Sequence, residues 1–214
     1  MRLIMIALLT AAVIGCVTAP AFSEDGKDIR DLAIGMKVAD LPQTGYVELV
    51  CAAMPEKQLD DWSGFATCPA NAAGQREVRF QFGDNDNPQT LLMDHDRGTR
   101  IGGHPVLISI LVSKGETVDA IIIETDPKVR LFLKKKAFLM GLQIRERYGV
   151  EGWTCINLPR AESEEAVGGQ LIKERCEKQT PARHYTYERQ LLQRSGLTLK
   201  DFISMTRLSI SAKE

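Results

Sequence analysis

Alternation of apolar and polar residues marks one strand of this chain clearly. Within Arg76–Phe82, the apolar residues Val78, Phe80 and Phe82 alternate with Glu77, Arg79 and Gln81, which is the period of a strand buried on one face. Two more apolar runs, Val106–Val112 and Thr117–Ile123, are separated by a short polar segment. The spacing predicts a hairpin, and the almost unbroken apolar content indicates that its strands are central in a sheet.

Shorter runs rich in β-branched and aromatic residues predict further strands, separated by turn-forming segments. They are Ile29–Ile34, Tyr46–Cys51, Gly169–Arg175, His184–Leu192 and Ile203–Ile210. We therefore expect an antiparallel sheet.

Between the two groups of strands, the pattern changes to the 3.6-residue period of a helix. Asp126 can accept a hydrogen bond from a first-turn N–H, and Pro127 suits the first helical position. Gly149 follows a basic last turn, which is a common way for a helix to end. The pattern predicts one helix over Pro127–Tyr148, of about six turns.

This predicted helix is apolar on two opposite sides. A broad arc, suited to packing on a sheet, consists of Val129, Phe132, Leu133, Ala137, Leu139, Met140 and Ile144. A second stripe consists of Leu131, Phe138 and Leu142. Both sides need a cover, and we expect the N-terminal region of the chain or a long loop to provide the second one.

Taken together, these elements predict a single α+β domain over residues 24–214. Its curved antiparallel sheet would have about six to eight strands, packed against one long central helix over residues 127–148.

Residues 1–23 have the composition of a signal peptide. Arg2 precedes an apolar stretch that is too short to span a bilayer comfortably, and small residues near Ser23 suit signal peptidase. Cys16 lies in a segment that resembles a relaxed bacterial lipobox, so lipidation at Cys16 is an alternative to simple cleavage. Both alternatives place the remaining chain outside the cytoplasm, and the compact signal favours the periplasm.

The charge balance gives no reason to expect nucleic-acid binding. The chain has 27 Lys and Arg against 28 Asp and Glu, and excluding residues 1–23 removes one basic residue, Arg2. Nucleic-acid binding normally needs a basic surface. We expect the partner to be an envelope protein or a small ligand, with membrane attachment only through Cys16.

Four cysteines follow the leader, an even number that favours disulfides in an exported protein. Pairing each with its nearest neighbour joins Cys51 to Cys68 and Cys155 to Cys176. Each loop of about 20 residues would stabilise the fold by about 3 kcal/mol. Zinc is the weaker alternative because the spacings lack the short Cys-x-x-Cys pattern.

Two places in the sequence suggest a ligand site. Lys136 falls in the middle of the helix's broad apolar arc, where its ammonium must reach water or meet an opposite charge. The structural interpretation is that its methylenes cover apolar surface while the ammonium reaches water. The functional hypothesis is that Lys136 marks the mouth of a cleft between helix and sheet, where an anionic group could bind. The glycines of residues 98–104 could hold an anion beside Arg97, Arg100 and His104, although they also suit a turn into the next strand.

An acidic loop is a weaker metal candidate. Asp84, Asp86, Asp94 and Asp96 offer oxygen ligands of the kind that Ca²⁺ prefers, but their spacing does not match a helix-loop-helix site. A solvated turn accounts for the same residues, so we expect no tight metal site and no cofactor.

No familiar catalytic motif occurs in the sequence. The three histidines, His95, His104 and His184, lie in different segments. We therefore expect a non-enzymatic periplasmic binding or accessory protein of the bacterial cell envelope. The alternatives are a periplasmic hydrolase or transferase whose site forms only in three dimensions, and a Ca²⁺-binding envelope protein.

Overall fold

The computed structural model describes residues 26–83, 98–196, 198 and 201–213. Its first group of strands ends with a long hairpin. The bounds are β1 Tyr46–Cys51, β2 Met54–Gln58, β3 Arg76–Phe82, β4 Arg100–Ile101, β5 His104–Val112 and β6 Val118–Thr125. Two 3₁₀ helices accompany them, η1 Val38–Asp40 and η2 Trp62–Thr67.

A helical segment and a second group of strands follow. The helical segment comprises α1 Leu131–Lys136, the 3₁₀ turn η4 Ala137–Leu139 and α2 Met140–Arg147. The later strands are β7 Thr154–Asn157, β8 Glu164–Glu165, β9 Ile172–Gln179, β10 Arg183–Arg194 and β11 Ile203–Ala212.

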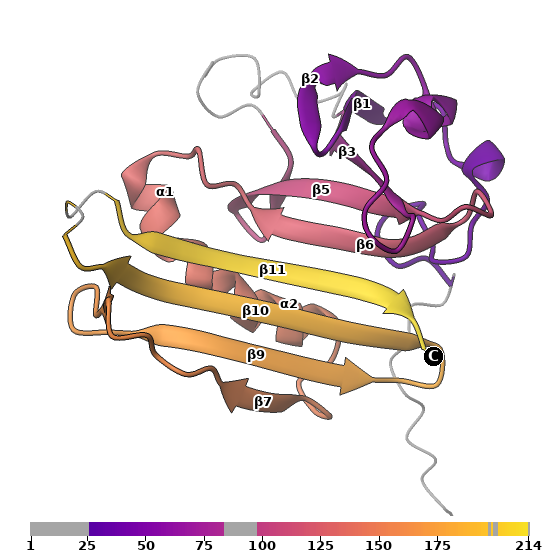
Figure 1. The fold of residues 1–214 in the computed structure, drawn as a ribbon. Coiled ribbons are helices and arrows are strands. Elements are labelled where there is room, and N and C mark those ends of the chain that lie inside the picture. The colour runs from indigo at the N-terminus through magenta and orange to yellow at the C-terminus, as the bar shows by residue number, and fades with distance from the viewer. Residues whose placement is uncertain (1–25, 84–97, 197, 199–200, 214) are drawn as a thin grey trace, which may run out of the picture.

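Within the described residues, these eleven strands form one antiparallel sheet. Nine strands run in the order β2-β1-β3-β5-β6-β11-β10-β9-β7, while β4 pairs with β5 and β8 pairs with β10. The two groups of strands join where β6 pairs with β11 over Ala120–Glu124 and Arg207–Ser211. Figure 1 shows the helical segment lying across one face of the sheet, behind β10 and β11.

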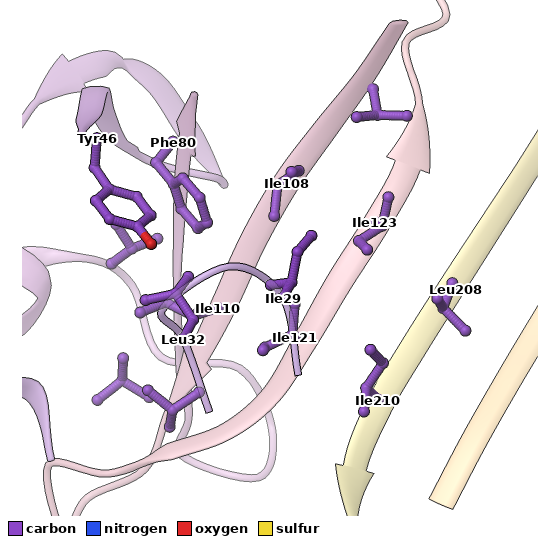
Figure 2. Packing of buried hydrophobic residues seen from close by; sticks show 14 of the residues in the cluster. Ile29, Leu32, Tyr46, Phe80, Ile108, Ile110, Ile121, Ile123, Leu208 and Ile210 are labelled. Carbon is purple, nitrogen blue, oxygen red and sulfur yellow. The ribbon is translucent and has the colours of Figure 1, made fainter. Parts of the chain in front are cut away.

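The core lies on the same face of the sheet as the helix. Ile108 and Ile110 of β5 and Ile121 of β6 are fully buried. Figure 2 shows Ile29 and Leu32, from the segment before β1, lying over these isoleucines. The N-terminal segment therefore covers the first group of strands, and the helical segment covers the second.

The predicted fold class is wrong in its main element. Strand accounts for 47% of the described residues and the helical segment for only 17 residues, so the sheet organises this part of the molecule and no long central helix forms in it. Antiparallel pairing is found, but the strands are more numerous than the six to eight predicted. Residues Pro127–Val129 form a turn, and Arg130 is extended.

The helix begins late because β6 continues further than predicted. Its pairing with β5 continues to Asp126, whose N–H donates to Pro105 O at 3.0 Å. The Asp126 carboxylate does accept a nearby N–H, that of Lys128 at 2.8 Å. This bond closes the turn after β6, and it does not cap a helix.

The helix is interrupted because hydroxyls of β11 take part in its hydrogen bonding. Phe138 N–H donates to Ser204 Oγ at 3.3 Å, and Thr206 Oγ1 donates to Ala137 O at 2.9 Å. Ser204 and Thr206 are both buried, so these bonds satisfy backbone groups where the regular helical ladder is absent. The sheet thus fixes the 3₁₀ turn η4.

Both predicted disulfides are confirmed. Cys51 of β1 is bonded to Cys68 at the end of η2, and Cys155 of β7 is bonded to Cys176 of β9. The second bond links residues that also face each other in the strand ladder. It ties the edge strand β7 to the rest of the sheet.

Candidate functional site

A cavity of about 270 Å³ lies between α2, the β4–β5 turn, the N-terminal segment and the inner face of the sheet. Its volume is near the lower end of the range for small-molecule sites. Its floor is apolar and belongs to the core: Ile123 of β6, Leu208 of β11, and Met140 and Ile144 of α2. The floor can therefore accept the apolar part of a ligand.

Three arginines surround this floor, each from a different part of the chain. Arg30 comes from the turn before β1, Arg100 from β4, and Arg147 from the last turn of α2. All three are exposed. Among the described residues that line the cavity, none is acidic, so this lining has a positive rim around an apolar floor.

The rim arginines are held in position by neighbouring groups. The Arg30 guanidinium lies 3.8 Å from the centroid of the Phe82 ring, and Arg100 Nη1 donates to Gly103 O at 3.3 Å. The Arg147 guanidinium lies 5.6 Å from the ring of Tyr148. A guanidinium recognises an anionic oxygen through paired N–H donors.

The backbone at Arg30 is strained. Its φ is 45°, in the left-handed region that costs an L-residue about 1–2 kcal/mol. Two bonds close the tight turn around it: Asp28 N–H donates to Leu32 O at 2.8 Å, and Leu32 N–H donates to Ile29 O at 3.0 Å. The turn places a long basic side chain at the cavity rim, where glycine would relieve the strain but remove the charge.

Gln143 of α2 adds an acceptor to the cavity wall. Its Nε2 donates to Gly102 O at 2.8 Å, which fixes the orientation of the amide. Gly102 has a φ of 54°, and a Cβ there would clash with that amide. The Gln143 Oε1 atom is buried without a hydrogen-bond partner among the described residues. Such an acceptor suits a ligand or water that carries a donor.

Burial also affects the tyrosine that adjoins Arg147. It raises the pKa of the Tyr148 hydroxyl, and the nearby Arg147 opposes this shift. Tyr148 is therefore neutral near pH 7, and its hydroxyl donates to Asp28 O at 3.5 Å. Tyr148 therefore lines the cavity as an uncharged side chain.

A second, more open groove of about 830 Å³ lies on the other side of Tyr148. Its main polar groups bind one another: Arg183 Nε lies 2.7 Å from Asp28 Oδ1, and Lys178 Nζ donates to Tyr148 O at 2.6 Å. Burial raises the pKa of Tyr185 in this groove to about 12. These contacts tie the N-terminal segment to β10 and the end of the helical segment to β9, so the polar groups of this groove already serve the fold and the smaller cavity is the better ligand site.

Of the four residues predicted for ligand binding, the structure places one at this cavity. Arg100 lines it. His104 is half-buried at the start of β5, and Lys136 is exposed on α1 with its Nζ 4.1 Å from the Phe132 ring centroid. Neither lines the cavity, although they are close enough for Lys136 to affect the pKa of His104. Arg97 lies outside the described residues.

The alternative metal site, formed by Asp84, Asp86, Asp94 and Asp96, also lies outside the described residues. The same holds for residues 1–23, which include Cys16. In the part of the chain that is described, one group has ligand atoms close enough for a metal: Cys155, Cys176 and Glu174. The two sulfur atoms are bonded to each other, so they are not available as thiolate ligands.

Sequence reasoning missed Arg30, Gln143 and Arg147 as site residues. Arg147 had a signal, because a straight helix places it in the same apolar arc as Met140 and Ile144. Nothing in the sequence indicates Arg30 or Gln143, because their roles depend on contacts with Phe82 and Gly102, which are distant in the chain.

Comparison with known proteins adds no assignment: no family model, curated protein or solved structure matches the chain. Within the described residues, no helix is both long and apolar enough to cross a membrane.

Proposed function

We propose that this chain is an exported, non-enzymatic binding protein of the bacterial cell envelope. Its ligand would be small, with an apolar part and an anionic group such as a carboxylate or phosphate. The apolar part would rest on Ile123, Ile144 and Leu208, and the anionic group would meet the arginines at the rim.

The observation that carries this proposal is the convergence of three arginines on one apolar floor. Arg30, Arg100 and Arg147 are far apart in sequence, yet all line the same cavity. Arginine binds carboxylate and phosphate through paired N–H donors, while the floor offers the apolar surface typical of a ligand pocket. Their combination favours an amphiphilic anion over a fully polar ion or a neutral hydrocarbon.

The disulfides support an exported location. Cys51–Cys68 and Cys155–Cys176 use all four cysteines that follow residue 25, and such bonds persist in oxidising compartments. The composition of residues 1–23 agrees with export. The periplasm is the compartment that we propose.

Isothermal titration with a matched pair of probes tests the binding proposal. Octanoate and octan-1-ol have the same chain length, but only octanoate is anionic at pH 7. We expect octanoate to bind more tightly by roughly tenfold or more, because a hydrogen bond to a charged group contributes about 1.5–3 kcal/mol. Equal affinity for the two probes would contradict the role of the arginines.

Two variants localise the binding. Arg100→Met with Arg147→Met keeps the apolar stems of the rim but removes two charges, so octanoate affinity should fall to that of octan-1-ol. Arg194→Met is the matched control, because Arg194 is exposed at the end of β10 and does not line the cavity. An equal loss of affinity in the control would show that octanoate binds elsewhere.

A further inference from the structure

The outer face of the helical segment carries large apolar side chains that point away from the sheet. We define this outer face by Leu131, Phe132, Leu139 and Leu142, whose exposed fractions are 46%, 68%, 36% and 57%. The second apolar stripe expected for a regular helix, Leu131, Phe138 and Leu142, shares only Leu131 and Leu142 with this face. Within the part of the chain that the structure describes, no other helix or strand covers the four exposed side chains. A stripe of this kind is typical of an interaction surface.

Basic residues flank this outer face. Residues 128–147 contain seven Lys and Arg and one acidic residue, Glu146, although the whole chain has a net charge of -1. Lys128, Arg130, Lys135 and Lys136 are all exposed, and we call these four the basic cluster. None of them forms an ion pair with another described residue. Positive charge is therefore concentrated beside the exposed apolar side chains.

We propose that the outer face docks on the surface of an anionic phospholipid bilayer. Leu131, Phe132, Leu139 and Leu142 would enter the boundary between headgroups and acyl chains, and the basic cluster would meet the lipid phosphates. A helix with an exposed apolar stripe and flanking Lys and Arg suits this position in a bilayer. This attachment needs no lipid at Cys16, and it does not rest on the ligand proposed for the cavity.

Charge also argues against a second copy of the chain as the occupant. In a two-fold symmetric dimer, the same surface meets itself, so the basic cluster of one copy would oppose that of the other. Like charges facing each other disfavour such a contact. An anionic surface instead satisfies both the apolar side chains and the lysines.

Vesicle flotation tests this proposal. Every sample is the full chain with Cys16→Ser, so no lipid can be attached at residue 16. Residues 1–25 are then the same in the parent chain and in all variants. The probes are vesicles of phosphatidylcholine alone and of phosphatidylcholine with phosphatidylglycerol. We expect binding to the anionic vesicles and weakening of that binding as salt rises, because salt screens the charges.

Two sets of variants separate the contributions of charge and apolar contact. Lys135→Gln with Lys136→Gln should lower the partition coefficient on anionic vesicles by roughly 30-fold, since each basic residue near such a surface contributes a factor of about five. Phe132→Ser with Leu142→Ser should also release the chain from the vesicles. The control for charge is Lys37→Gln with Lys114→Gln, and the control for apolar contact is Val47→Ser. These residues lie on other exposed parts of the chain. Both control variants should bind the vesicles as the parent chain does.

Three results would overturn the proposal. The first is a parent chain that does not bind the anionic vesicles, and the second is binding that both sets of variants retain. The third is a parent chain that forms a dimer in solution and that Phe132→Ser converts to a monomer, because the outer face would then be an interface between copies. Circular dichroism and thermal unfolding of each variant check that it keeps the fold.

Discussion

At the scale of single residues, His104 and Lys136 are close enough to affect each other. His104 is half-buried, and its pKa lies below the ordinary value of 6.5, first because of burial and second because of the positive charge of Lys136. Removing that charge should raise the pKa of His104. We expect an NMR titration to show the increase in Lys136→Gln.

Lys135→Gln is the matched control for this titration, because Lys135 is exposed on the same helix but is not among the causes of the His104 shift. An unchanged His104 pKa in Lys136→Gln would contradict the proximity of the two side chains.

The lowered pKa of His104 also makes stability depend on pH. Above the unfolded pKa of about 6.5, the neutral His104 favours the folded chain, and this contribution is lost as the pH falls towards the folded pKa.

Residue Lys136 also shows where sequence reasoning about the site fails. A regular helix turns by about 100° per residue, whereas a 3₁₀ helix turns by about 120°. The three residues of η4 therefore rotate α1 by roughly 60° relative to α2. Phe132 and Lys136 come to face water, while Arg147, which follows the break, reaches the cavity rim. The sequence pattern could suggest a basic residue at a cleft, but it could not identify which one.

At the scale of elements, the break in the helix depends on a buried hydroxyl of β11. Thr206 is fully buried, and its Oγ1 donates to Ala137 O at 2.9 Å. Thr206→Val keeps the shape of the side chain but leaves that carbonyl oxygen without its donor. We expect the free energy of unfolding to fall by about 1–3 kcal/mol, measured by urea denaturation.

Thr186→Val provides the control for this substitution. Thr186 is a half-buried residue of β10, and its side chain faces away from the helical segment, so the same change should alter the free energy of unfolding by less than about 0.5 kcal/mol. Equal losses in the two variants would show that the bond from Thr206 to Ala137 has no special role.

The edge strand β7 gives a second prediction at this scale. All four of its residues are exposed, and it is held by its pairing with β9 and by the Cys155–Cys176 bond. Replacing both cysteines with serine removes a constraint of about 3 kcal/mol. Hydrogen exchange at the amides of Thr154–Asn157 should then accelerate by roughly tenfold or more.

The first disulfide supplies the comparison for β7. Cys51→Ser with Cys68→Ser removes a bond of similar sequence separation, 17 residues against 21, but at the other end of the sheet. Exchange in β7 should be little affected by that change. Similar acceleration in both double variants would mean that β7 opens only when the whole chain unfolds.

Strands with a clear apolar pattern could be predicted, and edge strands could not. The bounds of β1 and β3 match the prediction because these strands carry a buried face. Strands β2 and β7 were missed because their residues are mostly exposed and show no alternation. The predicted strand Ile29–Ile34 is instead a turn, in which Ile29 and Leu32 form an isolated bridge.

At the scale of the whole molecule, the path of the sheet decides where the site forms. Pairing of β6 with β11 brings Ile123 beside Leu208, and these two residues form part of the cavity floor. The N-terminal turn and β4 then bring Arg30 and Arg100 to its rim. The disulfide pairs followed from cysteine number and spacing, but this convergence depends on contacts across the whole chain and has no local signal.

Native mass spectrometry of the full chain, gently extracted from its own cell envelope, tests the proposed function most directly. We expect the parent chain to carry a noncovalently bound small molecule with an acidic group, and we expect the double variant Arg100→Met, Arg147→Met to lack it. A parent chain without any bound molecule, or a double variant that retains the same molecule, would contradict the proposal that this cavity binds an anionic ligand.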